Sequence, residues 1–257
     1  MEFEQAADVA EHAAREGGRI LEEWAQKFTV SEKSRSNLVT EADFVSQQAI
    51  HQILKNAFPT HGFLGEEGLS SEGDDPDYRW IIDPLDGTGN YVHRFPYYGV
   101  SIALEYQSTM VVGIVFDPNR NELFRAVKDA GTTLNGEKIT VSQNESLSES
   151  MLMASLPVAT DASNPAVMRF LNVIPHAQSV QRSGSAALNL SNVAAGRLDG
   201  FWSTSLKPWD MAAGILLVTE AGGTVTTVDG SPFVVDDADL LASNGLSLHT
   251  EVQQYLV

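Results

Sequence analysis

Two carboxylates, Asp83 and Asp86, stand on either side of a proline at the end of an apolar run, residues 80–88 with sequence WIIDPLDGT. Asp, Pro and Gly are residues that ordinary turns prefer, so this segment alone fits a plain turn as well as a site. If the segment is a site, the proline stiffens the turn so that both carboxylates point to one place. Hard cations such as Mg²⁺ prefer oxygen ligands of this kind. Gly87 would then let a ligand approach the backbone, and a helix beginning near Thr88 would offer N–H groups to a phosphate.

Further acids stand at comparable places, beside glycine or proline. Glu66 and Glu67 follow the short apolar stretch 62–64, and Asp210 precedes an apolar helical segment. Each has an ordinary explanation: a solvated loop for the glutamates, an acid in the first helical turn for Asp210, and a capping box with Thr40 for Asp43. Taken together, the acids at strand ends and helix starts favour a multi-metal site for phosphoryl chemistry.

The charge balance supports this interpretation conditionally. The chain has 34 acidic and 16 basic residues, a formal net charge of −18. Such a surface repels nucleic acid and anionic membranes, so neither is an expected partner. It also repels a small phosphate ester unless a bound metal supplies positive charge.

Other function classes are excluded by composition. The absence of cysteine rules out disulfides, thiolate metal sites and a cysteine nucleophile. No apolar run approaches the roughly 18 residues that span a bilayer, and the acidic start does not resemble a signal peptide. We therefore expect a cytoplasmic protein.

Hydrophobic spacing predicts a layered protein in which helices cover sheets, with the strand order left open. We expect one compact domain over residues 1–257, with sub-halves at about 1–145 and 146–257 separated by the polar segment 142–150. The predicted helices are residues 3–28, 40–57, 165–171, 186–195, 208–220 and a terminal helix. The predicted strands are 80–82, 99–106, 110–116, 122–127, a hairpin of 132–134 with 138–141, and 151–156, 198–202, 224–228 and 240–242.

Two segments together resemble the inositol monophosphatase family. Residues 80–91 are similar to its first signature, and residues 208–214, continued by 220–223, are similar to its second. Residues 37–43, 65–68 and 93–96 also match in order. The resemblance implies an αβαβα five-layered sandwich of the inositol monophosphatase and fructose-1,6-bisphosphatase type. It also implies a homodimer, two or three Mg²⁺ ions, direct attack of water on a small phosphate ester, and frequent inhibition by lithium.

The resemblance further implies roles for individual residues. The implied metal ligands are Glu66, Asp83, Asp86, Asp210 and the carbonyl of Leu85. The implied catalytic residues are Glu66, Thr88 and Asp43. The implied phosphate- and substrate-binding residues are Asp86, Gly87, Thr88, Gly184, Ser185, Ala186, Ser203 and Asp210. Glu67 and Lys33 are implied to lie around these ligands, and Arg182 to be structural.

Two positions depart from the family pattern. Gly89 replaces a common threonine at a position that is not a ligand. Ser203 stands seven residues before Asp210, where the family commonly has a glutamate that accepts a hydrogen bond from a ring hydroxyl of inositol. Because a site built on matched hydrogen bonds discriminates strongly when one is missing, inositol 1-phosphate is either not the physiological substrate or is bound differently. Compensation by Thr204 or Lys207 is the alternative.

Three functions stay open. The first is hydrolysis of a polyol or sugar monophosphate, including inositol or histidinol phosphate. The second is hydrolysis of a bisphosphate such as fructose 1,6-bisphosphate or a nucleotide 3′,5′-bisphosphate. The basic residues that could bind its second phosphate are Lys33, Arg35, Arg94 and Lys207. The third is a regulatory binding protein without activity, which idle buried carboxylates argue against because they repel one another.

Overall fold

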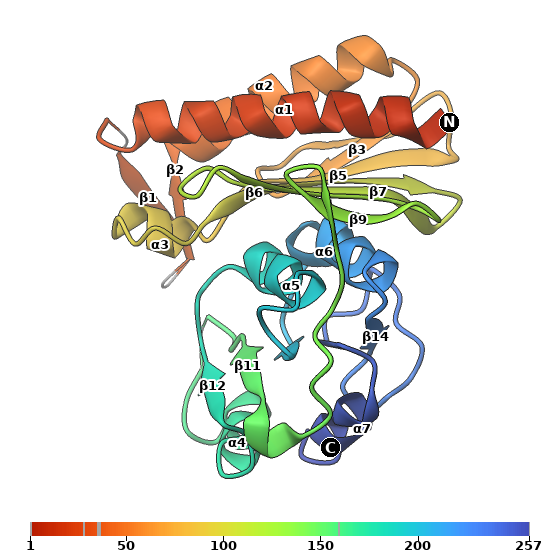
Figure 1. The fold of residues 1–257 in the computed structure, drawn as a ribbon. Helices are drawn as coiled ribbons and strands as arrows, with labels where there is room; N and C mark the ends of the chain where they lie inside the picture. Colours follow the sequence, from red (N-terminus) through yellow and green to blue (C-terminus); the bar gives the residue numbers. More distant parts are fainter. Residues whose placement is uncertain (1, 28, 35–36, 159, 257) are drawn as a thin grey trace.

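The chain folds into five layers of alternating helices and sheets (Figure 1). The computed structural model describes residues 2–27, 29–34, 37–158 and 160–256, without the side chains of residues 2 and 30–39. Helices α1 and α2 cover one face of an eight-stranded sheet, and α5 and α6 lie between this sheet and a five-stranded one. Helices α4 and α7 cover the outer face of the second sheet. The predicted αβαβα sandwich is confirmed.

The first sheet has the order β10-β9-β8-β7-β6-β5-β3-β4, and the second has the order β12-β11-β13-β15-β14. The helices are α1 (Glu2–Trp24), α2 (Glu41–Ala57), α3 (Thr88–Val92), α4 (Pro165–Val173), α5 (Ala186–Ala194), α6 (Pro208–Glu220) and α7 (Ser247–Gln253), with a 3₁₀ turn at Leu147–Glu149. The strands of the first sheet are β3 (Gly62–Gly65), β4 (Ser70–Ser71), β5 (Tyr78–Asp86), β6 (Gly99–Tyr106), β7 (Thr109–Asp117), β8 (Glu122–Val127), β9 (Gly131–Leu134) and β10 (Glu137–Ile139). The strands of the second are β11 (Met151–Ala154), β12 (Ser179–Gln181), β13 (Gly200–Ser203), β14 (Thr224–Thr226) and β15 (Leu240–Ser243), while β1 (Val30–Ser34) and β2 (Asn37–Thr40) form a separate hairpin.

Most predicted elements are present, with ends that differ by a few residues. The first helix ends at Trp24, short of Phe28, which lies outside the described residues. The hairpin β1–β2 and the strand β12 have no counterpart in the sequence prediction. Both are short and largely polar, so no apolar alternation announces them.

The apolar residues of β5 show how the layers are fastened together. Trp80 and Ile82 belong to the core under α1 and α2, whereas Ile81 belongs to the core around α5 and α6. This alternation follows the two-residue period of a strand that is buried on both faces. A third core, which contains Trp202, lies between the second sheet and the outer helices.

The middle layer contacts both sheets closely. A Cβ added to Gly113 on β7 would lie 2.6 Å from the carbonyl oxygen of Ala213 on α6, and one added to Gly214 would lie 2.5 Å from Leu190 on α5. The absence of side chains at these glycines therefore lets α6 approach the strand and its neighbouring helix. This packing supports the prediction of one compact domain, which stays a prediction. None of the helices in the described part of the chain has the length and apolar character needed to cross a membrane.

Replacing Gly113 by alanine should lower the free energy of unfolding by about 1–3 kcal/mol, because the new methyl group would force the backbone of α6 away from the sheet. Urea denaturation measures this change. Gly89→Ala is the matched control, since a Cβ there meets nothing within 4 Å, and it should change stability by no more than about 0.5 kcal/mol. Equal stability of Gly113→Ala and the wild type would contradict the proposed close contact.

Candidate active site

Three carboxylates converge where β5 ends and α6 begins. One oxygen from each of Asp83, Asp86 and Asp210 lies within 4.8 Å of the other two. Asp83 is 1% exposed and Asp86 is 8% exposed, so little water screens these groups. Among the residues that the structure describes, no other group of three histidine, cysteine, aspartate or glutamate side chains meets this criterion.

The turn around Pro84 brings the two carboxylates of β5 together. The pairing of β5 with β6 is regular up to Asp83 opposite Ser101, and then shifts by one residue before Asp86 opposite Gly99. Such a bulge re-aims the side chains next to it. The N–H of Leu85 donates to Oδ1 of Asp83 over 3.0 Å, which fixes that carboxylate inside the turn.

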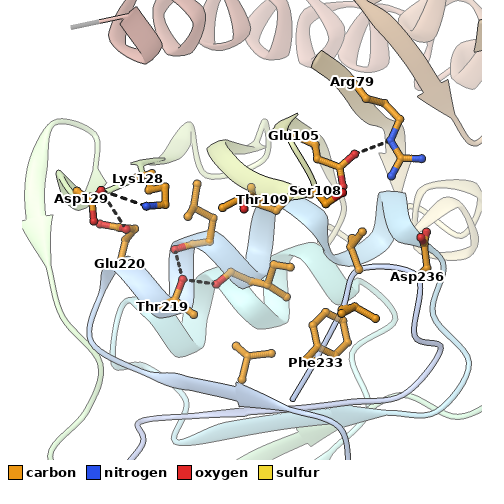
Figure 2. Close-up of a pocket in the computed structure, with 16 residues that line it drawn as sticks. Arg79, Glu105, Ser108, Thr109, Lys128, Asp129, Thr219, Glu220, Phe233 and Asp236 are labelled. Carbon is orange, nitrogen blue, oxygen red and sulfur yellow. Dashed lines mark hydrogen bonds and ion pairs between the residues drawn. The ribbon is translucent and has the colours of Figure 1, made fainter. Parts of the chain in front are cut away.

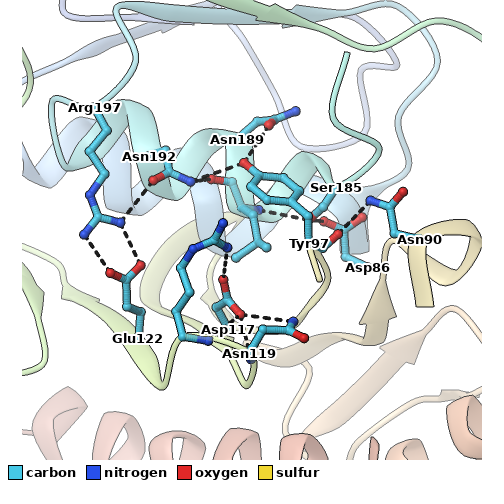
Figure 3. Close-up of polar contacts among 12 residues, drawn as sticks. Asp86, Asn90, Tyr97, Asp117, Asn119, Glu122, Ser185, Asn189, Asn192 and Arg197 are labelled. Carbon is cyan, nitrogen blue, oxygen red and sulfur yellow. Dashed lines mark hydrogen bonds and ion pairs between the residues drawn. The ribbon is translucent and has the colours of Figure 1, made fainter. Parts of the chain in front are cut away.

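Asp86 is held by the start of α5, as Figure 3 shows. Its Oδ2 accepts hydrogen bonds from Oγ of Ser185 and from the N–H of Ala187, each over 2.6 Å. Ser185 is also the N-cap of α5, because its Oγ accepts from the N–H of Leu188. The positive end of the α5 dipole and these donors therefore face a negative charge of the site. Ala186 follows Ser185 as the first helical residue.

Asp210 and Asp43 both occupy the first turn of a helix, as the sequence suggested, while their roles in catalysis stay predictions. Each closes a capping box, in which Lys207 N–H donates to Asp210 over 2.7 Å and Thr40 N–H donates to Asp43 over 2.9 Å. Asp43 also accepts a hydrogen bond of 3.3 Å from the hydroxyl of Thr88, which lies 3.2 Å from the Leu85 carbonyl oxygen. The capping boxes thus hold these acids at the site.

Glu66 and Glu67 are placed beside this group by α2. Gln47 accepts a hydrogen bond from the N–H of Glu67 and donates one to its carbonyl oxygen, over 3.0 and 3.1 Å. Glu66 is not among the three acids that meet within 4.8 Å, but its charge acts on the pKa of Asp83 and of Asp210. Its role as a ligand stays a prediction.

Sequence reasoning missed the supporting residues of α2. Gln47 holds the Glu67 backbone, and Oγ of Ser46 donates to the carbonyl oxygen of Pro84 over 3.2 Å. The signal was available: positions 43, 46, 47 and 50 share one helical face, and the first three are polar. Polar residues on a buried helical face indicate a face that supports a site rather than a plain core.

Burial and mutual repulsion disfavour the charged forms of these acids. Burial, then the charges of Glu66, Asp86 and Asp210, raise the pKa of Asp83 well above its ordinary value. Burial raises the pKa of Asp86 to about 6, and burial together with the charge of Asp86 raises the pKa of Asp210 to about 8. Burial also raises the pKa of Asp43 to about 6. Clustered oxygen donors that repel one another fit a hard divalent cation.

The remaining predicted residues occupy varied surroundings. Gly87 has φ +99° and a Cβ there would lie 3.1 Å from the Tyr97 carbonyl oxygen, so only glycine suits this position. Gly184 is exposed at φ +92°. Ser203 is fully buried, and its Oγ has no hydrogen-bond partner within the described part of the chain. Lys33 lies outside the residues whose side chains the structure describes.

A separate pocket of about 460 Å³ lies at the other end of α6, as Figure 2 shows. Several of its charged groups are already engaged: Arg79 pairs with Glu105 over 2.7 Å, and Glu220 accepts the N–H groups of Asp129 and Gly131. None of the three clustered aspartates lines it. The carboxylate cluster, not this pocket, therefore marks the candidate site.

Comparison with known proteins agrees with the geometry. The inositol monophosphatase family model matches residues 2–257. An inositol-1-monophosphatase of Synechocystis sp. is 43% identical over 93% of this chain and 84% of its own length. A protein of Pseudomonas aeruginosa named Nus factor SuhB is 37% identical over 97% of this chain and 96% of its own. The crystal structure of the extragenic suppressor protein suhB from Bartonella henselae superposes with a TM-score of 0.94 at 36% identity, covering 98% of both chains.

The cluster predicts a test by removal of the cation. Without it, Asp83→Asn should melt at a higher temperature than the wild type at neutral pH, because one of the repelling charges is gone and an amide oxygen can still accept from Leu85. Saturating Mg²⁺ should raise the melting temperature of the wild type by roughly 5–10 °C and that of Asp83→Asn by much less. Differential scanning calorimetry with EDTA and with Mg²⁺ measures both changes. Asp129→Asn, an exposed acid, is the control, and an equal Mg²⁺ effect in Asp83→Asn would refute the assignment.

Proposed function

The chain belongs to the inositol monophosphatase family, and we propose that it hydrolyses a small phosphate monoester with the help of magnesium. The curated relatives named inositol-1-monophosphatase are phosphoric monoester hydrolases. The observation that carries the proposal is the convergence of the buried Asp83 and Asp86 with the half-buried Asp210, acids that repel one another until a cation binds. We propose these three as ligands, together with Glu66 and the carbonyl oxygen of Leu85.

The residues of the chain would then position the reactants. A bound magnesium ion supplies positive charge to the phosphoryl oxygens and makes a water molecule a better nucleophile. The hydroxyl of Thr88 has Asp43 and the Leu85 carbonyl oxygen as acceptors for its hydrogen, so its oxygen keeps a lone pair that can accept a hydrogen bond from the attacking water. Asp43, with a pKa of about 6, accepts the hydrogen bond that orients Thr88. Glu66, whose charge acts on Asp43 and Asp83, would act on the same water.

The phosphate and the leaving group would lie between the start of α3 and the start of α5. The N–H groups of Gly87 and Thr88 begin α3, and Gly184, Ser185 and Ala186 lead into α5. Backbone donors at such positions suit the three phosphoryl oxygens. In-line displacement needs mainly this positioning and charge stabilisation.

We propose a polyol or sugar monophosphate other than inositol 1-phosphate as the preferred substrate. Ser203 cannot supply the carboxylate that a ring hydroxyl would meet, and its own hydroxyl is buried. A bisphosphate is the second candidate substrate, because its second phosphate would need positively charged side chains. Lys207 and Arg94 are exposed basic residues that lie close in sequence to Asp210 and to α3, respectively. The predicted Arg35 lies outside the described residues.

A binding role without hydrolysis is favoured by one observation, the name Nus factor SuhB carried by several relatives at 36–37% identity. The retained acids oppose it, because an idle cluster of buried carboxylates would only destabilise the fold. A homodimer, a cytoplasmic location and inhibition by lithium belong to the same proposal and stay predictions.

A panel of phosphate esters tests the reaction. The panel holds inositol 1-phosphate, histidinol phosphate, glycerol phosphates, fructose 1,6-bisphosphate and adenosine 3′,5′-bisphosphate, and phosphate release is measured with Mg²⁺ and with EDTA. We expect turnover of one class only with Mg²⁺, and a loss of about 100-fold or more in Asp83→Asn and in Asp210→Asn, because each removes a charged ligand. Asp129→Asn is the control. A folded wild type that binds Mg²⁺ and hydrolyses none of the panel would support the binding role instead.

Ser203 is tested by restoring the glutamate of the family. Ser203→Glu should raise kcat/KM for inositol 1-phosphate, relative to glycerol phosphate, by about ten-fold, the value of one added hydrogen bond. Ser203→Ala is the matched variant and should leave this ratio unchanged, since it removes a hydroxyl without a described partner. Thermal melting establishes that both variants fold. An unchanged ratio in a folded Ser203→Glu would show that this position does not select the alcohol.

A further inference from the structure

Asn90 joins three segments that meet beside the candidate site. Its Nδ2 donates to the carbonyl oxygen of Tyr97 over 2.7 Å and to that of Ser183 over 2.8 Å. Asn90 itself lies on α3, Tyr97 precedes β6, and Ser183 lies on the loop that leads into α5. Figure 3 shows Asn90 next to Asp86 and Ser185. One side chain therefore ties the loop before α5 to the turn that carries Asp86.

The loop packs directly on this amide. Gly184, which follows Ser183, has φ +92°, and a Cβ there would lie 3.0 Å from both Nδ2 and Oδ1 of Asn90. No side chain fits between the loop backbone and the amide. The next residue is Ser185, whose hydroxyl donates to Asp86. The Asn90 amide therefore fixes the backbone two residues before Ser185, whose hydroxyl contacts Asp86 of the carboxylate cluster.

The chemistry of the contact requires an amide. Both partners of Nδ2 are carbonyl oxygens, which only accept, so the NH₂ group must face them and each of its hydrogens serves one carbonyl. An aspartate has the same shape but no donor, and its charge would repel both oxygens. An alanine would leave both carbonyl oxygens without this donor.

The loop has a second anchor, which limits the damage that loss of Asn90 would do. Oγ of Ser183 donates to Oδ1 of Asn189 over 2.6 Å, and the hydroxyl of Tyr97 donates to the same oxygen over 3.0 Å. Asn189 is fully buried on α5. The fold should therefore survive without Asn90, while the loop at residues 182–185 loses its attachment to α3.

We propose that Asn90 is a positioning residue that fixes the 182–185 loop against α3, so that the loop backbone at Gly184 and Ser185 faces the phosphate while Ser185 and Ala187 hold Asp86. This inference rests on the proposed phosphatase function for its kinetic consequence, but its structural consequence can be measured without turnover. Asn90 touches none of the proposed metal ligands in the described contacts. Loss of Asn90 should therefore lower the affinity for the phosphate ester more than the affinity for Mg²⁺.

The test compares Asn90→Asp and Asn90→Ala with Asn192→Ala. Asn192 is a matched control because its Nδ2 also donates two hydrogen bonds, to the Leu188 carbonyl and to the Tyr97 hydroxyl, yet it does not contact the loop. We expect kcat/KM for the preferred ester to fall about 10- to 100-fold in both Asn90 variants, with the larger loss in Asn90→Asp. The affinity for Mg²⁺, measured by calorimetry, should change less than about three-fold, and Asn192→Ala should keep both values.

Two readouts do not depend on turnover. Amide hydrogen exchange of residues 182–187 should become at least about ten-fold faster in the Asn90 variants and stay unchanged in Asn192→Ala. The affinity for inorganic phosphate in the presence of Mg²⁺ should fall in parallel with kcat/KM. If the wild type hydrolyses no ester, these two readouts still decide the inference, and the proposed function alone fails.

Gly184→Ala gives a further check by a double-mutant cycle. In the wild-type background the added methyl group meets the Asn90 amide, whereas in the Asn90→Ala background that contact is absent. The two substitutions should therefore be non-additive, with Gly184→Ala costing less kcat/KM, and less phosphate affinity, in Asn90→Ala than alone. Additive effects, or loop exchange and phosphate affinity in Asn90→Asp equal to those of Asn192→Ala, would overturn the inference.

Discussion

Three clustered carboxylates that repel one another determine what the surrounding elements must do. One carboxylate oxygen from each of Asp83, Asp86 and Asp210 lies within 4.8 Å of the other two. Burial and the charges of its neighbours raise the pKa of Asp83, and burial with the charge of Asp86 raises the pKa of Asp210. Their neighbours do not remove this repulsion but fix each acid in place: a backbone N–H holds Asp83, the start of α5 holds Asp86, and a capping box holds Asp210. Because so many contacts keep these negative groups together, a bound cation is what would stabilise the arrangement.

The layered architecture explains how acids from distant parts of the chain meet. β5, an interior strand of the first sheet, carries Asp83 and Asp86 at its C-terminal end, while α6 follows β13 of the other sheet and carries Asp210. The bare backbone at Gly113 and Gly214 lets α6 lie close to β7 and α5. Small residues far from the acids therefore help to set the geometry of the site, because they set the distance between the layers that carry them.

The sequence predicted the parts of the site that depend on local geometry. The turn around Pro84, the capping box of Asp43 and the place of Asp210 in a first helical turn could be predicted from spacing, because each involves residues within a few positions of one another. The family resemblance supplied the five layers, which spacing alone did not order. Asn90 was missed because its partner Ser183 is 93 residues away in the chain, and no local pattern marks such a contact. The hairpin β1–β2 was missed because its residues are mostly polar.

The residues that would perform the reaction and those that would select the alcohol occupy different elements. The clustered acids follow the family pattern, whereas Ser203, at the end of β13, departs from it. Ser203 is buried and its hydroxyl has no described partner, so the substitution left a polar atom unsatisfied where a longer acid is common. On the proposed function, a change of this kind would alter which alcohol is accepted without disturbing the carboxylates, because Ser203 ends β13 of the second sheet whereas Asp83 and Asp86 lie on β5 of the first. Selectivity in this fold can therefore change while the chemistry is kept.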